Sequence, residues 1–132
     1  MHFLLDTNIC IYLIKRRPDT VLQRFSSLSV GEIGISSVTL FELAYGAYKS
    51  TQTEKSLQAL KRFISPLKVL PFDTDDAFEA GQIRAALALI GQPIGPYDLQ
   101  IAAQARRRSL ILVSNNLREF ERVDGLQLEN WV

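Results

Sequence analysis

Near the start of the chain stand Phe3-Leu4-Leu5-Asp6-Thr7-Asn8, a short apolar run followed by an acid and two further polar residues. A short apolar run of this kind is typical of a strand buried within a sheet. Asp, Thr and Asn all cap helices, so a helix is expected to follow over about Ile9–Lys15. This passage therefore predicts a buried strand that leads directly into a helix, with Asp6 at the junction.

The same alternation continues along the chain. Further strands are predicted at 32–36, 68–72, 110–113 and 126–131, and further helices at 18–28, 38–48, 51–64, 74–89, 95–107 and 116–120. Pro18 is expected as the first residue of its helix, and Thr51-Gln52-Thr53-Glu54 matches a capping box. Alternating strands and helices predict an α/β fold, with a central parallel sheet of about five strands and helices on both faces. Ligands of such folds bind beyond the carboxyl ends of the strands.

Length and composition limit the classes of protein that this chain can represent. Its 132 residues suit one domain, spanning 1–132, and 47% hydrophobic with 22% charged residues is an ordinary globular mix. A net charge of +1 neither demands nor excludes nucleic-acid binding. The single cysteine, Cys10, excludes an intrachain disulfide and fits a reducing cytoplasm. No stretch is apolar enough for a signal peptide or a membrane span, so a cytoplasmic protein is expected.

Three acids stand in positions that favour function over structure. Asp6 follows the first strand, where helix capping and function are both open interpretations. Glu42 is the only charged residue between Val38 and Tyr48, in a helix so apolar that it is expected to be mostly buried. A buried carboxylate needs a distant arginine or a cation as its partner. Asp98 could stabilise the start of its helix, but it shares a face with the apolar Ile101, Ala102 and Ala105.

A fourth group of polar residues follows the strand at 110–113. Ser114 and Asn116 lie in a polar turn, and Glu119 comes three residues after Asn116. Asn116 and Glu119 could form a capping pair, or these residues could supply further oxygen ligands. Clustered carboxylates cannot all stay charged without a cation. Because the chain has one histidine, His2, and no Cys/His set for zinc, the oxygen ligands favour magnesium or manganese and phosphoryl chemistry.

Four motifs, taken together, resemble the PIN domain, and specifically the VapC toxins of bacterial VapBC toxin–antitoxin modules. The matching segments cover essentially the whole chain: Leu5-Asp6-Thr7-Asn8, Ile35–Leu43, Gly95-Pro96-Tyr97-Asp98 and Val113–Phe120. The resemblance implies a PIN fold and an endoribonuclease toxin of a type II module that depends on magnesium or manganese. It also implies inhibition by a VapB antitoxin, a homodimer, and initiator tRNA as substrate, cut in its anticodon stem-loop to block translation.

The resemblance carries catalytic roles onto Asp6, Glu42, Asp98 and Glu119, with Asp6, Asp98 and Glu119 as metal ligands. Asn8, Ser114 and Asn116 are expected to support the ligands or the substrate. Many PIN domains have an aspartate in the turn after the fourth strand, where this chain has Asn116. That difference makes Glu119 the favoured fourth acid.

Several alternatives remain at this point. The basic runs Lys15–Arg17 and Arg106–Arg108 are typical of helix C-termini, although they could position phosphates. The side chains of Tyr45, Tyr48 and Tyr97 could pack in the core or stack on bases. The helices at 38–48 and 51–64 carry more apolar surface than one sheet face needs, which indicates an interface. The alternative functions are a non-catalytic RNA-binding or regulatory domain and a phosphoacceptor receiver domain. The receiver lacks support because a second acid beside Asp6 and a lysine after the last strand are both missing.

Overall fold

The computed structural model describes residues 1–132 and contains one parallel sheet with the strand order β3-β2-β1-β4-β5. The strands are β1 (Phe3–Leu5), β2 (Ile33–Ser36), β3 (Lys68–Leu70), β4 (Ile111–Val113) and β5 (Gln127–Glu129). The predicted α/β class and five-stranded sheet are confirmed. β3 lies at an edge and ends at Leu70, directly before Pro71, which has no N–H to donate within a sheet. No helix is both long and apolar enough to cross a bilayer.

β1 occupies the centre of the sheet and sets the position of the chain segments that follow each strand. Leu5 pairs with Ile35 of β2 on one side and with Val113 of β4 on the other. The strands are parallel, so their carboxyl ends meet at one edge. Asp6 and Ser114 directly follow the paired residues Leu5 and Val113, and therefore emerge side by side at this edge.

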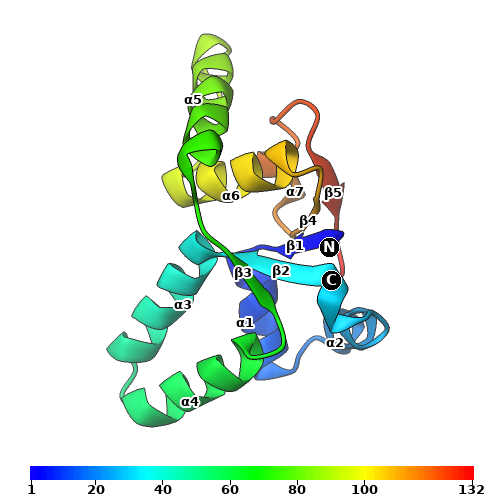
Figure 1. Ribbon diagram of the computed structural model, residues 1–132, viewed down its shortest axis with the longest axis vertical. Helices are drawn as coiled ribbons and strands as arrows, with labels where there is room; N and C mark the ends of the chain where they lie inside the picture. Colours follow the sequence, from blue (N-terminus) through cyan, green and yellow to red (C-terminus); the bar gives the residue numbers. More distant parts are fainter.

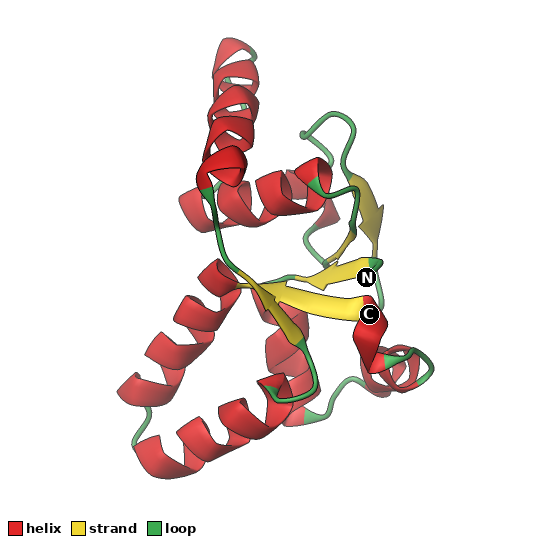
Figure 2. Cartoon of the chain, in the orientation of Figure 1, coloured by secondary structure: helices red, strands yellow, loops and turns green.

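Helices cover both faces of the sheet, because side chains of β1 alternate between two cores (Figures 1 and 2). Leu4 packs into a core with α5 (Thr74–Leu89), α6 (Pro96–Arg107) and α7 (Leu117–Phe120). Phe3 and Leu5 pack into the opposite core. That face carries the remaining helices: α1 (Thr7–Lys15), α2 (Asp19–Ser26), α3 (Ser37–Lys49) and α4 (Thr53–Ile64).

Side chains cap two of the helices that follow strands, and the cap predicted at Asp6 is confirmed. Asp6 Oδ1 accepts a hydrogen bond from the Ile9 N–H at 2.9 Å, and so starts α1. Ser36 Oγ accepts one from the Val38 N–H at 2.9 Å, and so starts α3. Both cap residues end or follow strands, so the turn from strand to helix is satisfied by one side chain in each case.

Two other predicted helix starts are wrong. Pro18 is the cap residue of α2, which begins at Asp19. No capping box forms at 51–54, since Gln52 precedes α4 without a side-chain cap bond. Thr53 Oγ1 instead lies 3.0 Å from the Ser50 carbonyl oxygen, and so bonds back toward the end of α3. The short connection between α3 and α4 is therefore held by the Thr53 hydroxyl group and not by a capping box of Thr51 and Glu54.

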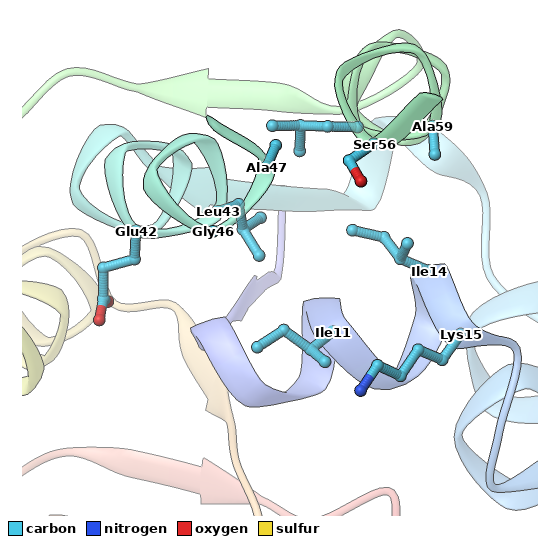
Figure 3. A pocket seen from close by; sticks show the side chains of 10 residues that line it. Ile11, Ile14, Lys15, Glu42, Leu43, Gly46, Ala47, Ser56 and Ala59 are labelled. Atoms are coloured by element: carbon cyan, nitrogen blue, oxygen red, sulfur yellow. The ribbon is translucent and has the colours of Figure 1, made fainter. Parts of the chain in front are cut away.

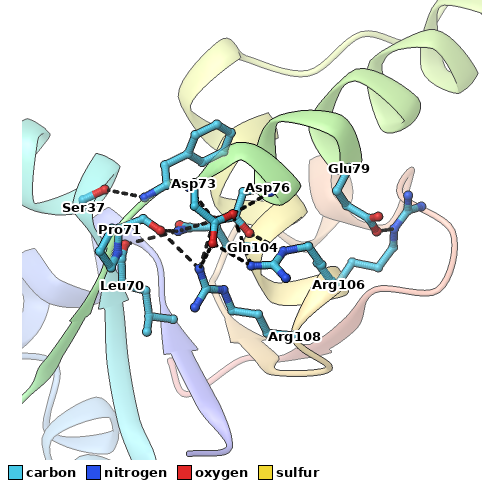
Figure 4. Close-up of polar contacts among 11 residues, drawn as sticks. Ser37, Leu70, Pro71, Asp73, Asp76, Glu79, Gln104, Arg106 and Arg108 are labelled. Carbon is cyan, nitrogen blue, oxygen red and sulfur yellow. Dashed lines mark hydrogen bonds and ion pairs between the residues drawn. The ribbon is translucent and has the colours of Figure 1, made fainter.

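A buried ionic network joins the start of α5 to the end of α6 (Figure 4). Asp76 is fully buried, and its two oxygens accept hydrogen bonds from Arg107 Nε at 2.7 Å and Arg108 Nη2 at 3.0 Å. Arg106 pairs with Glu79 nearby at 2.6 Å. These three arginines therefore fix one helix against another, and α6, which carries Asp98, is held at its carboxyl end.

The network also determines the charge of Asp76. Burial alone would raise the pKa of its carboxyl group, but hydrogen bonds from the Asp73 backbone, Arg107, Arg108 and Gln104 outweigh burial and lower the pKa to about 2. A carboxyl pKa below the unfolded value of 3.8 stabilises the fold above about pH 4. That contribution is lost as the pH falls from about 4 to about 2.

We expect Asp76→Asn to lower the free energy of unfolding at pH 7 by about 2 kcal/mol, because two arginines lose their buried partner and keep only the exposed Asp73. Thermal melts should show this difference shrinking as the pH falls from 5 to 2. Asp75→Asn is the matched control, since Asp75 is an exposed acid in the same helical turn. Its effect should not exceed about 1 kcal/mol. Equal stabilities of wild type and Asp76→Asn at pH 7 would contradict this role.

Candidate active site

The acids predicted from the sequence come together at the carboxyl edge of the sheet. Asp6 lies between β1 and α1 and is 4% exposed. Glu42 lies in α3, Asp98 in the first turn of α6 and Glu119 in α7. The charges of Asp6, Glu42 and Glu119 all act on Asp98, so the four carboxyl groups form one acidic cluster, which is called the acidic pocket below.

Burial and crowding both oppose the charged form of Asp6. Burial raises the pKa of its carboxyl group, and the nearby charge of Glu42 raises it further. Hydrogen bonds from Ser114 and from the Ile9 N–H act in the opposite direction. The cap of α1 and the side chain after β4 therefore hold Asp6 in a place that disfavours its charge.

Asp98 shows the strongest effect of crowding among these acids. Burial raises the pKa of its carboxyl group to about 6, together with the charges of Glu119, Asp6 and Glu42 and a hydrogen bond with the Glu119 side chain. No lysine or arginine forms an ion pair with any of these four acids; the ion pairs of the chain involve other residues. The pocket therefore holds negative charge that the protein leaves uncompensated.

Glu42 is oriented by the hydroxyl group of Thr7 and has no cationic partner. Thr7 Oγ1 donates to Glu42 Oε1 at 2.7 Å and lies 3.2 Å from Thr39 Oγ1. The expectation that its helix is mostly buried is wrong. Phe41, Tyr45 and Tyr48 are 53%, 60% and 67% exposed, and Glu42 itself is half-buried. The apolar side chains around Glu42 therefore do not all serve the core of this chain.

The turn after β4 connects the pocket to the start of α6. Ser114 Oγ accepts a hydrogen bond from the Asn116 N–H at 2.9 Å, and Asn116 Nδ2 donates to Glu119 Oε2 at 2.7 Å. Glu119 Oε1 accepts from the Gly95 N–H at 2.8 Å. Asn116 and Glu119 thus pair through their side chains and do not form a capping pair for α7, which has no side-chain cap bond.

The hydrogen bond between Asn116 and Glu119 gives a physical reason for an asparagine, and not an aspartate, at position 116. An aspartate at this position would place a second carboxylate against Glu119, whereas the amide of Asn116 donates a hydrogen bond. Asn8, by contrast, is exposed and makes no side-chain hydrogen bond, so the structure does not bring it into this network.

Three residues of the network were not identified from the sequence: Thr7, Thr39 and Gly95. A signal existed for Thr39, which precedes Glu42 by three residues and therefore shares its helical face. Thr7 was interpreted only as a possible cap. The hydrogen bond of Gly95 to a residue 24 positions away has no local signal.

The donor set of the pocket suits a hard divalent cation. Only oxygen atoms are offered, and the raised pKa values of Asp6 and Asp98 show carboxylates that a cation would stabilise. As placed, no three acidic, histidine or cysteine side chains lie close enough together to hold a metal ion between them. Magnesium commonly uses one or two carboxylates and keeps several waters, so a complete protein cage is not required.

Comparisons with known proteins agree with this geometry. The family model of the PIN domain matches residues 3–126. The tRNA(fMet)-specific endonuclease VapC of Shigella flexneri is 53% identical over 131 residues, covering 99% of this chain and 98% of the relative. The chain belongs to the VapC ribonucleases of the PIN-domain family.

Further relatives support the same assignment. Ribonuclease VapC2 of Haemophilus influenzae is 48% identical, covering 100% of this chain and 99% of the relative. The crystal structure of DNA-bound VapBC from Salmonella typhimurium matches with a TM-score of 0.95 and 50% identity, covering 100% of this chain and 99% of the other. The protein is thus a nuclease of a family that depends on metal ions, and the receiver-domain alternative is wrong.

The raised pKa of Asp98 leads to a prediction about Asp98→Asn. In EDTA at pH 7 the variant should be more stable than wild type by up to about 2 kcal/mol, because it lacks a crowded charge. The folded pKa of about 6 exceeds the unfolded 3.8, so metal-free wild type should gain stability as the pH falls from 7 to 4. The variant should not show this gain.

Thermal melts with EDTA and with magnesium test this prediction. Added magnesium should stabilise wild type more than Asp98→Asn, since the variant offers one charged ligand fewer. If the variant loses stability in EDTA and keeps the full magnesium shift, Asp98 is only a stabilising acid at a helix start.

Proposed function

We propose that this chain is an endoribonuclease toxin that cleaves initiator tRNA in its anticodon stem-loop with magnesium or manganese, and so blocks translation. The observation that carries the proposal is the pocket of uncompensated carboxylates at the carboxyl ends of β1 and β4. The substrate follows from the VapC of Shigella flexneri, a tRNA(fMet)-specific endonuclease with 53% identity. The whole chain, 1–132, acts as one domain, and its place is the cytoplasm, where tRNA and a free thiol at Cys10 are both expected.

We assign the central roles to Asp6, Asp98 and Glu42. Asp6 and Asp98 would hold the cation, since their carboxyl groups have the raised pKa values. Glu42, oriented by Thr7, is the third acid of the pocket. Glu119 is the fourth acid; its two oxygens accept hydrogen bonds from Gly95 and Asn116, which hold it beside Asp98.

A bound divalent cation would polarise the scissile phosphate and lower the pKa of an attacking water. The pocket has no histidine that could deprotonate the ribose 2′-hydroxyl. His2 lies at the opposite end of β1, 3.2 Å from Glu32. The chain's own groups therefore suit hydrolysis by water better than internal attack by the ribose.

We expect the purified protein to cut tRNA(fMet) in magnesium or manganese and to leave 5′-phosphate and 3′-hydroxyl ends. Mapping of cut ends after incubation with total RNA measures both site and chemistry. EDTA should abolish cleavage, and Asp6→Asn should reduce it by at least about 100-fold. Cleavage that persists in EDTA, or 2′,3′-cyclic phosphate products, would exclude the mechanism; an inactive wild type would favour the non-catalytic alternative.

We further propose that the toxin forms a homodimer and binds a VapB-type antitoxin. An apolar pocket of about 290 Å³ lies between α1, α3 and α4, and its lining includes Ile11, Leu43 and Leu60. Glu42 lies at one end of this pocket, so a segment seated there would reach the acids (Figure 3). The solved relatives from Salmonella typhimurium and Rickettsia felis are VapBC complexes, which supports an antitoxin segment as the occupant.

The exposed aromatic side chains of α3 supply the surface for the second copy. Phe41, Tyr45 and Tyr48 follow one another at helical spacing and are all more than half exposed. Three apolar residues of α4 also belong to the helices for which an interface is predicted. Leu60 is buried within the chain, and Leu57 and Phe63 are half-buried. The surplus apolar surface is therefore concentrated on α3.

We expect sedimentation at micromolar concentration to show a dimer. Tyr48→Lys should raise its dissociation constant by about tenfold or more, because it places a charge where the dimer would bury an aromatic side chain. Val30→Lys is the matched control, since Val30 is 49% exposed on a different part of the chain. A monomer with and without antitoxin, or equal effects of the two variants, would contradict the proposed interface.

A further inference from the structure

Glu119 makes two hydrogen bonds that tie α7 to the start of α6. Its Oε1 accepts from the backbone N–H of Gly95 at 2.8 Å, and its Oε2 accepts from Asn116 Nδ2 at 2.7 Å. Asn116 is in turn fixed through its own N–H to Ser114 Oγ, which follows β4. Glu119 is thus held at both oxygens, and its orientation is set by the turn after β4.

The Gly95 N–H is the donor that Asp98 would otherwise bind. Gly95 is the cap residue of α6, Pro96 is its first residue, and Asp98 is therefore the third. An acid at the third position of a helix commonly accepts a hydrogen bond from the N–H of the cap residue, as in a capping box. The same arrangement occurs in α5, where Asp76 Oδ2 accepts from the Asp73 N–H at 2.9 Å.

In α6 this local bond does not form. Asp98 makes no hydrogen bond to the Gly95 N–H, although its Oδ2 lies only 3.6 Å from the position that a Cβ atom at residue 95 would occupy. Glu119 Oε1 lies 3.8 Å from that position. Two carboxylates therefore stand beside one donor, and Glu119 holds it.

We propose that Glu119 is a positioning residue: it occupies the Gly95 N–H and thereby keeps the Asp98 carboxyl group beside it, turned away from the start of its own helix and toward the acidic pocket. This inference rests on the proposed function for its consequence, which is the availability of Asp98 to a cation. The change of acceptor at the Gly95 N–H, from Glu119 to Asp98, involves only residues of this chain. Without Glu119, Asp98 turns back onto its own helix and leaves the pocket.

The first test compares Glu119→Gln with Glu119→Ala. The glutamine side chain keeps an oxygen for the Gly95 N–H, whereas the alanine side chain offers none. The rise in melting temperature caused by magnesium chloride should persist in Glu119→Gln and be lost in Glu119→Ala, and cleavage should follow the same order with a difference of about tenfold or more. If Glu119 is instead a charged metal ligand, both variants lose the magnesium shift alike.

A second change at residue 95 makes the test specific. Gly95 has a φ of −57°, which proline can adopt, and proline has no N–H to attract Asp98. In the Glu119→Ala background, adding Gly95→Pro should restore the magnesium shift, whereas adding Gly95→Ala should not. Alanine is the matched control because its Cβ makes only ordinary contacts and its N–H is kept. Absence of rescue in a folded double variant contradicts the proposal.

Hydrogen–deuterium exchange of the Gly95 amide in EDTA tests whether Asp98 can replace Glu119 as its acceptor, without metal or RNA. The amide should be protected in wild type and in Glu119→Ala, where Asp98 replaces Glu119. It should exchange about tenfold or more faster in Glu119→Ala combined with Asp98→Ala, which removes both acceptors. Loss of protection in Glu119→Ala alone would overturn the proposal, even in a protein with normal nuclease activity. An inactive wild type with the expected exchange pattern would overturn only the proposed function.

Discussion

Repulsion among the carboxylates of Asp6, Glu42, Asp98 and Glu119 is the constraint on which this structure depends. Each close pair of like charges costs on the order of 1–4 kcal/mol at effective dielectric constants between those of water and a protein surface. The raised pKa values of Asp6 and Asp98 are the direct result. Because the pocket opposes folding in the absence of a cation, other parts of the chain must hold its walls in place.

The stabilising contacts are accordingly separated from the pocket. The central strand β1 packs into a core on each face, so the residue before Asp6 is fully buried. α6 is held by Ile101, Ala102 and Ala105 along its length and by the ion pairs of Asp76 at its carboxyl end. Three consecutive arginines are engaged in this second region, 106–108, and none of them reaches the acids. These arginines therefore neutralise acids that hold α6 in place, and none of them neutralises the acidic pocket.

Local patterns predicted the parts of the structure that depend on nearby residues. The strand before Asp6, the bounds of α5 and α6, and the two caps at Asp6 and Ser36 all follow from side chains within a few positions. Asp6 and Asp98 were also recognisable, because each is an acid in an apolar context next to a predicted strand end or helix start. Their placement in one pocket followed from the parallel order of the strands.

The contacts between distant segments could not be predicted in this way. Thr7 and Glu42 are separated by 35 positions, and Gly95 and Glu119 by 24. The capping box expected at 51–54 does not form either, and Thr53 within that segment donates to carbonyl groups at the end of the preceding helix. The start of α6 shows the principle most clearly. A glycine cap has no side chain to bind the first amides, so the donor at Gly95 is open to any acid that the fold brings near. Local sequence favours Asp98 for that bond, and the turn after β4 supplies Glu119 in its place. Tertiary structure therefore decides which carboxyl group binds the Gly95 N–H, and so leaves Asp98 beside the other acids.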